Sequence, residues 1–252
     1  MSYHKLIKSG KKLEHFRYER TPAVIEQGSN VLQHLAHDRR KATDSQTMVR
    51  RQDNAHRAQV AFGRLCESNF NQSETAVYVT FSFKPTEIWE QPTIQQGYAL
   101  FHVFTVRLRQ RYGTHIRYIA VPEFGKRNTQ RLHIHALFWG LPLEEIKQER
   151  QTRNFAKVWK YGFTDVVVTD NNVKVGYYLA KYLSKAYKEP KFFGSRSYVT
   201  SRNILRPIIY NDFVTLLLEY EFSNTQLVRS AIYDTKHLGE CQYKEYELLD
   251  TT

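Results

Sequence analysis

Cysteine is scarce in this chain: only Cys66 and Cys241 occur among 252 residues. Two cysteines supply neither a disulfide framework nor a four-cysteine zinc site, so we expect a reducing compartment, the cytoplasm. No apolar run approaches the roughly 20 residues of a membrane span, and residues 1–16 lack the apolar centre of a signal peptide. We therefore expect no membrane partner. The pattern GxxxxGK[ST] is also missing, which excludes a P-loop helicase within this sequence.

Acidic residues are fewer than basic ones, 25 against 37, giving a net charge of +12. The excess is uneven: residues 76–206 carry +12, whereas residues 1–75 carry +5 and residues 207–252 carry −5. A basic surface favours a polyanionic partner bound in a salt-sensitive way, although many basic surfaces serve solubility alone. Hydrophobic residues make up 41% of the chain, which is enough for a sizeable core.

The chain divides into three parts by composition. Residues 1–42 are polar without clear periodicity, and we expect a flexible arm. Residues 43–207 form the main domain, which begins with a basic helix, and residues 208–252 form an acidic extension with a helix at 210–222 and a strand at 225–234. The basic helix either lies along a DNA backbone or presents a solvated face. Its candidate DNA contacts are Arg50, Arg51 and Arg57.

Strand and helix patterns alternate along the main domain in the order β-α-β-β-α-β-α. This order predicts an α+β fold with a central antiparallel sheet and packed helices, on a ferredoxin-like or RRM-like plan. The expected strands are residues 76–83, 116–124, 131–140 and 163–170, and the expected helices are residues 93–112, 143–162 and 173–187.

Two histidines stand two residues apart in the strand RLHIHALFWG, residues 131–140. The period of two puts His133 and His135 on one face. If the strand pairs with residues 116–124 in a hairpin centred near Asn128, Glu123 lies opposite His133 on that face, and a one-residue slip would remove it. Two imidazoles and a carboxylate suit a divalent metal, whereas the plainer interpretation is two half-buried core histidines.

Tyrosines recur at helical spacing in VKVGYYLAKYLSKAY, residues 173–187. Tyr178 and Tyr182 lie one turn apart at the edge of an apolar stripe, with Lys181 and Lys185 beside them. The plainer interpretation is an amphipathic helix with boundary tyrosines and solvated lysines. Near a metal, however, a phenol can attack a phosphodiester and form a 5′-phosphotyrosine, with the lysines adding positive charge at the phosphate.

Three stretches occur in the order AVYVTFSFKP (76–85), VPEFGKRNTQRLHIHALF (121–138) and YYLAKYLSK (177–185). In this order they resemble the motifs of the HUH endonucleases, specifically rolling-circle replication initiators. The tyrosine pair resembles the two-tyrosine subgroup, the A-type phage initiators and the gene II-type initiators of filamentous phages. The segment SRSYVTSRNILRP, residues 195–207, is similar to the one that follows the tyrosine helix in that family.

The resemblance implies a metal-dependent enzyme that nicks and rejoins single-stranded DNA. It implies Mg²⁺ or Mn²⁺ on Glu123, His133 and His135, with Tyr178 and Tyr182 as alternating nucleophiles. The implied partners are an origin of single-stranded DNA, in hairpin form or not, and a separate helicase and polymerase of the host. Further candidate DNA contacts flank the metal motif at Lys126, Arg127 and Arg131.

Two other functions fit the same sequence. A transposase of a single-stranded DNA element would share the chemistry and differ in its DNA. A non-catalytic RRM-like nucleic-acid-binding module would bind without cutting, but it leaves the ordered motifs unexplained.

Overall fold

The structure is a computed structural model with two compact units. It describes residues 2–21, 44–70, 75–88, 90–125, 130–148, 154–169, 176, 179–180, 182–183, 190–192, 195–211 and 224–249; for residues 44–52 it describes the backbone alone. The central unit comprises residues 52–205, and the terminal unit comprises residues 1–51 together with residues 206–252.

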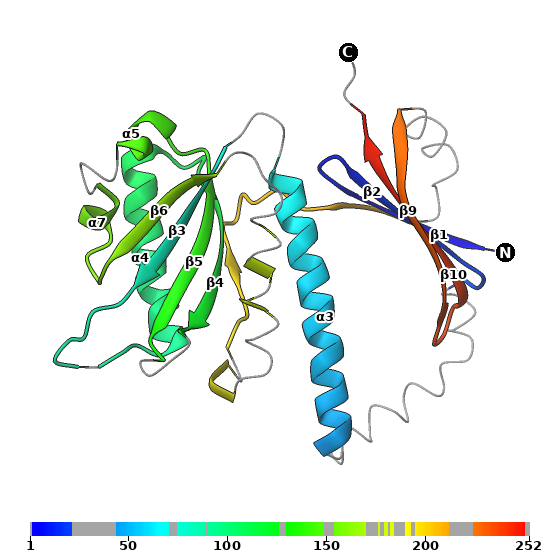
Figure 1. The fold of residues 1–252 in the computed structure, drawn as a ribbon, viewed down its shortest axis with the longest axis horizontal. Helices are drawn as coiled ribbons and strands as arrows, with labels where there is room; N and C mark the ends of the chain where they lie inside the picture. The colour runs from blue at the N-terminus through cyan, green and yellow to red at the C-terminus, as the bar shows by residue number, and fades with distance from the viewer. Residues whose placement is uncertain are drawn as a thin grey trace. The chain divides into compact units, whose positions relative to one another are not determined.

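The central unit is a five-stranded antiparallel sheet with helices on both faces (Figure 1). Its order along the chain follows the predicted alternation of strands and helices. The elements are α3 (Asp44–Asn69, which continues across the unit boundary), β3 (Ala76–Ser82), α4 (Ile94–Tyr112), β4 (Arg117–Phe124), β5 (Leu132–Trp139), α5 (Leu143–Lys147), α7 (Asn154–Val158), β6 (Thr164–Thr169), the 3₁₀ turn η2 (Pro190–Phe192) and β7 (Val199–Thr200).

The strand order of this sheet is β6-β3-β5-β4-β7. Its first four strands, numbered along the chain, have the order 4-1-3-2 of a ferredoxin-like sheet, so the predicted α+β plan is confirmed. Pairing between β4 and β5 is antiparallel and sets Glu123 opposite His133. The predicted hairpin and its register are therefore correct.

Each face of the sheet has its own apolar layer. On one face, Phe101, Phe104 and Leu108 of α4 pack with Phe155 and other aromatic side chains over the inward residues of β3 and β5. On the other, Phe62 and Leu65 of α3 pack with Leu179 and Leu183 over Leu137 and Trp139. Helices α4, α5 and α7 lie on the first face and α3 on the second (Figure 1). The histidine strand is thus a central strand covered on both sides, as its doubly apolar pattern predicts.

The helix predicted at residues 143–162 differs from the observed structure. Two short helices, α5 and α7, occupy its ends, and helical structure stops at Val158 instead of near Gly162. The physical reason lies at Tyr161 and Phe163, whose backbone carbonyls accept hydrogen bonds from Lys84 and Ser82 and so extend the β3 pairing. Tertiary pairing overrides the local helical pattern here.

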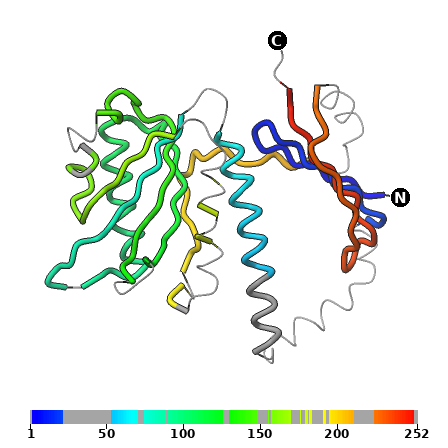
Figure 2. The backbone as a smooth tube through the Cα atoms, viewed as in Figure 1, coloured from blue at the N-terminus to red at the C-terminus, as the bar shows by residue number. Residues whose placement is uncertain are grey.

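The terminal unit is a second five-stranded antiparallel sheet, ordered β8-β1-β2-β10-β9. Figure 2 shows residues 3–18 running beside residues 239–248, although they are at opposite ends of the chain. Its strands are β1 (Tyr3–Ser9), β2 (Lys12–Tyr18), β8 (Ile208–Asn211), β9 (Thr225–Thr235) and β10 (Gly239–Leu248).

This sheet corrects the expectation of a flexible arm over residues 3–18. Hydrogen bonding to β8 and β10 orders a segment whose own sequence has no clear periodicity. The strand predicted at residues 225–234 is confirmed as β9. The helix predicted at 210–222 begins instead with β8 up to Asn211, and the rest of it lies outside the described residues. Within the described part of the chain, no helix is long and apolar enough to cross a membrane.

Candidate nicking site

His135 is the centre of a polar cluster on the α3 face of the sheet. Its Nε2 lies 2.9 Å from Glu123 Oε2 on the neighbouring strand β4. Its Nδ1 lies 2.7 Å from the Tyr78 hydroxyl and 3.2 Å from Thr80 Oγ1, both on β3. With Glu123 ionised, Nε2 carries the proton and Nδ1 accepts a hydrogen bond from a β3 hydroxyl. Both ring nitrogens of the histidine are therefore held in fixed directions.

Tyr182 stacks directly on the ring of His135. The two ring centroids are 4.5 Å apart and the planes differ by only 3°. Tyr78 lies nearly parallel to His135 as well, at 5.9 Å and 17°. Tyr182 is 7% exposed, so this ring belongs to the packed layer and is not a surface side chain. The structure thus brings one of the two predicted tyrosines onto the predicted histidine pair.

His133 lies beside His135, with 6.3 Å between the ring centroids. Burial lowers the pKa of His133; the charges of His135 and Arg131 lower it further, and Glu123 opposes them. A lowered pKa keeps the imidazole neutral at physiological pH. A neutral imidazole is the form that can bind a metal ion.

The helix that bears Tyr182 is held against α3. Leu179 and Leu183 are fully buried in the shared apolar layer, and the Gln59 side chain donates to the Ala180 carbonyl at 3.4 Å. At position 176 a glycine allows a close approach, because a Cβ there would lie 2.7 Å from the Cβ of Cys66. Burial raises the pKa of the Cys66 thiol, so this cysteine serves packing and not nucleophilic chemistry.

Whether Glu123, His133 and His135 suit a metal ion is judged from the arrangement and chemistry of their donor atoms. Among the residues the structure describes, no three His, Cys, Asp or Glu side chains are arranged to hold an ion. The Glu123 carboxylate instead contacts His135 Nε2 directly. By donor chemistry alone, a carboxylate and two imidazoles on one face are ligand types that divalent ions accept, and Glu123 and His135 already bring two such atoms to within 2.9 Å of each other.

The remaining predicted residues lie in several places. Arg57 is exposed on α3 and Arg131 is exposed just before β5. Arg50 and Arg51 lie in α3, with side chains that are not described. Outside the described residues lie Tyr178, Lys181, Lys185, Lys126 and Arg127.

Sequence reasoning missed Tyr78. Its alternation with Thr80 along β3 places both on one face, but its contact with His135 depends on how β3 pairs with β5. The relevant signal was a tyrosine on the same face as Thr80 and Ser82 in the run AVYVTFSF. A hydroxyl that fixes the second nitrogen of a ligating histidine orients that ligand.

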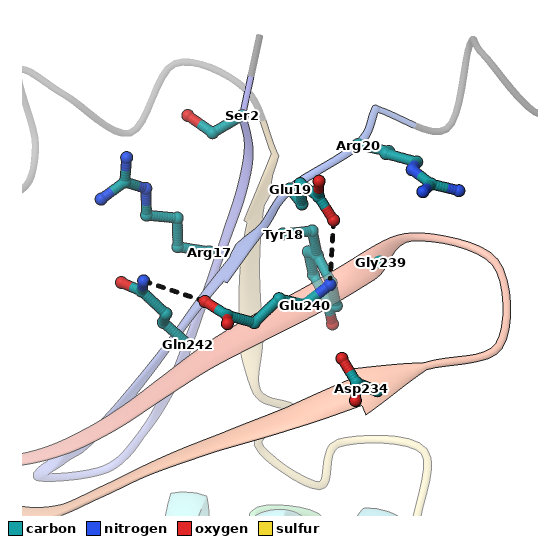
Figure 3. A pocket seen from close by; sticks show the side chains of 9 residues that line it. All are labelled: Ser2, Arg17, Tyr18, Glu19, Arg20, Asp234, Gly239, Glu240 and Gln242. Carbon is teal, nitrogen blue, oxygen red and sulfur yellow. Dashed lines mark hydrogen bonds between the residues drawn. The ribbon is translucent and has the colours of Figure 1, made fainter.

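The terminal unit contains a separate pocket of about 650 Å³ (Figure 3). Its wall mixes guanidinium groups of Arg17 and Arg20 with carboxylates, and Glu19 accepts a hydrogen bond from the Glu240 backbone N–H. None of the predicted site residues lines it.

Residues 76–187 match the family model of the replication-associated proteins of the ORF2 and gene II protein type. Searches of curated proteins and of solved structures found no match. The matched segment begins at β3 and extends beyond Leu183, so it includes Tyr78, Glu123, both histidines and Tyr182. Over residues 76–187, the chain is therefore similar to replication-associated proteins of the ORF2 and gene II protein type.

Proposed function

We propose that the protein initiates rolling-circle replication by nicking and rejoining single-stranded DNA through a tyrosine. The observation that carries the proposal is the stacking of Tyr182 on His135 at 4.5 Å. A boundary tyrosine would pack equally well anywhere along the apolar layer. Its position on the histidine that also contacts Glu123 supports a role in chemistry, and the family match supports a role in replication.

In this proposal Glu123, His133 and His135 hold a divalent ion, Mg²⁺ or Mn²⁺. When bound, the ion supplies positive charge that polarises the scissile phosphate. Tyr78 and Thr80 keep the Nδ1 side of His135 engaged, so Nε2 is the nitrogen directed at the site. Binding then requires the other neutral tautomer of His135, in which the proton sits on Nδ1 and is donated to a β3 hydroxyl. The Nε2 lone pair and the Glu123 carboxylate would then both be available to the ion.

The reaction is a transesterification at phosphorus. The phenol oxygen of Tyr182 or Tyr178 forms a bond to phosphorus, the bond to the 3′ oxygen breaks, and the proton lost by the phenol ends on the 3′-hydroxyl. The 5′ end stays on the tyrosine as a phosphodiester, so the reverse step rejoins DNA without ATP. A two-tyrosine cycle, in which the second phenol attacks after one round, follows from the spacing of four residues.

Lys181 and Lys185 are proposed to add positive charge at the phosphate. The DNA substrate is an origin in single-stranded form; a host polymerase extends the 3′-hydroxyl while a separate host helicase unwinds the duplex. Basic side chains near the site, such as Arg57 and Arg131, are proposed to contact the backbone of this DNA.

The test uses single-stranded oligonucleotides tiled across the replicon that encodes the protein, with Mn²⁺ or with EDTA. Wild type is compared with Tyr178→Phe, Tyr182→Phe and the double variant, and products are separated under denaturing conditions. We expect a metal-dependent covalent protein–DNA adduct that the double variant does not form. Survival of the adduct in one single variant identifies the first nucleophile.

Tight binding without an adduct on any oligonucleotide, with either metal, would overturn the proposal in favour of a binding module. Adduct formation only at the hairpin ends of a mobile element would instead indicate a transposase.

A further inference from the structure

A second pocket lies in the central unit, at the start of α4 and the end of β4, with a volume of about 380 Å³. This volume is within the range of small-ligand pockets. At the start of α4, the backbone N–H groups of Thr93 and Gln96 are already bonded within a capping box. We therefore consider the side chains that line the pocket.

One wall of the pocket is an aromatic ring with a cation over it. Phe124 is partly exposed, and the Lys191 ammonium lies 5.0 Å from its ring centroid. Lys191 is exposed and also reaches Gln130. An exposed lysine can move to a nearby phosphate and leave the ring face to a flat ligand. Proteins that bind single-stranded nucleic acid commonly combine a cation, which contacts the phosphate backbone, with an aromatic ring on which a base stacks.

The pocket is also lined by amide and hydroxyl groups. The Gln95 amide donates to Ser195 Oγ at 3.0 Å, and both residues line the pocket. Gln91 also lines the pocket, and its amide oxygen is buried from solvent without a hydrogen-bond partner among the described residues. A buried acceptor without a donor costs free energy, so a ligand that brings an N–H group is favoured. Nucleobases carry such groups on their edges.

We propose that this pocket binds one base of the single-stranded DNA next to the nicking site, with Phe124 stacking on the base and Gln91 accepting from its edge. The inference rests on the proposed function for the presence of single-stranded DNA. It adds a positioning subsite that lies outside the histidine and tyrosine cluster.

The location of Phe124 favours this occupant. It directly follows Glu123 in β4, and consecutive strand residues point to opposite faces of the sheet. The pocket is therefore one residue along β4 from Glu123 but on the other face of the sheet, and in this proposal the DNA turns around the end of β4 to reach it. A base that turns around this end of β4 no longer stacks on the neighbouring bases and stacks on the ring of Phe124 instead.

The test compares binding of two fluorescent probes in EDTA, where no cleavage occurs: a 12-nucleotide oligo-dT and an abasic backbone of the same length. Phe124→Leu keeps an apolar side chain but removes the flat ring, and Gln91→Met removes the amide with little change in volume. Tyr233→Leu, an aromatic substitution in the terminal unit, is the matched control. Circular dichroism verifies that each variant folds.

We expect Phe124→Leu to bind oligo-dT about tenfold more weakly and the abasic backbone as wild type does. Gln91→Met loses about threefold for oligo-dT, and Tyr233→Leu is unchanged. A probe with 5-iodouracil should crosslink to the peptide that contains Phe124.

Equal losses for both probes in Phe124→Leu, or crosslinks only elsewhere, would overturn the base pocket. The adduct assay keeps the two proposals apart. If wild type forms the adduct but Phe124→Leu and Gln91→Met bind oligo-dT as wild type does, the base pocket is overturned and the nicking function stands. Failure of wild type to bind oligo-dT at all overturns the base pocket, and the nicking function is then judged by the adduct assay alone.

Discussion

At the scale of single residues, the orientation of His135 depends on hydroxyl groups that are not among the candidate metal ligands. The Tyr78 hydroxyl at 2.7 Å and the Glu123 carboxylate at 2.9 Å engage opposite nitrogens of His135. Such outer contacts fix the tautomer and the ring orientation of a ligating histidine. The ring of Tyr182 is stacked on the same imidazole, so its position depends on that orientation as well.

Removing the hydroxyl in Tyr78→Phe should therefore weaken Mn²⁺ binding by about 10- to 100-fold. The phenyl ring keeps its parallel packing on His135, so we expect little change in unfolding temperature. Isothermal titration calorimetry with Mn²⁺ measures the affinity. Tyr161→Phe, on the opposite face of the sheet, is the control. An affinity equal to that of wild type would show that Tyr78 does not orient a metal ligand.

A second residue-scale prediction concerns His15 in the terminal sheet. Burial, with the neighbouring charges of His4, Lys244 and Arg17, lowers the pKa of His15 to about 4. The unfolded chain binds a proton near pH 6.5, so the folded state loses stability as pH falls from 6.5 to about 4 and changes little below that. Partial exposure of His15 screens the effect, and we expect a loss of ~1–2 kcal/mol.

Urea unfolding followed by circular dichroism at pH 7 and pH 4.5 measures this loss. His15→Gln removes the titrating group and should flatten the pH dependence of the unfolding free energy over that range. A wild-type slope that persists in His15→Gln would assign it to other groups.

At the scale of elements, the tyrosine helix is placed by its contact with α3. Gly176 meets Cys66 so closely that a methyl group at position 176 would overlap its Cβ. Gly176→Ala should therefore push this helix away from α3, with a cost of ~1–3 kcal/mol in stability. Because Tyr182 lies on the same helix, the yield of covalent adduct should fall too.

Gly63→Ala on α3 is the matched substitution, since a Cβ at position 63 meets nothing within 4 Å. Replacing a mid-helix glycine by alanine should stabilise that variant by ~0.5–1 kcal/mol. Thermal unfolding and adduct yield are measured for both. If Gly176→Ala is destabilised but keeps the full adduct yield, the reaction does not depend on the exact position of this helix.

Local patterns predicted the elements that carry the site, but not all of their contacts. The period of two in β5 and the hairpin with β4 were sufficient to place Glu123 opposite His133. The contact of Tyr78 with His135 was not predictable in this way, because it joins strands 57 residues apart in sequence. The terminal sheet was missed for the same reason: Phe16 pairs with Tyr243, and no local periodicity specifies a partner at that separation.

At the scale of the whole molecule, the positive and the negative charge excess lie in different segments of the chain. Residues 76–206 carry +12 and residues 207–252 carry −5, so the basic excess belongs to the part of the chain that bears the family motifs. A single-stranded partner bound mainly through phosphates should show an observed affinity that falls with salt by a slope of about −0.7 per neutralised phosphate. Salt dependence therefore counts phosphate contacts across the molecule.

Arg131 is a specific case of this dependence. It is exposed immediately before the histidine strand, and its charge already acts on His133. Arg131→Ala should reduce the magnitude of the salt slope for a 12-nucleotide oligo-dT by about 0.7, the loss of one contact, with weaker binding at every salt concentration. Lys236→Ala, an exposed lysine in the terminal unit, should leave the slope unchanged. Fluorescence anisotropy from low to moderate salt measures both slopes. If the Arg131 variant keeps the wild-type slope, the guanidinium does not contact a phosphate, and its influence is limited to the protonation of the neighbouring histidine.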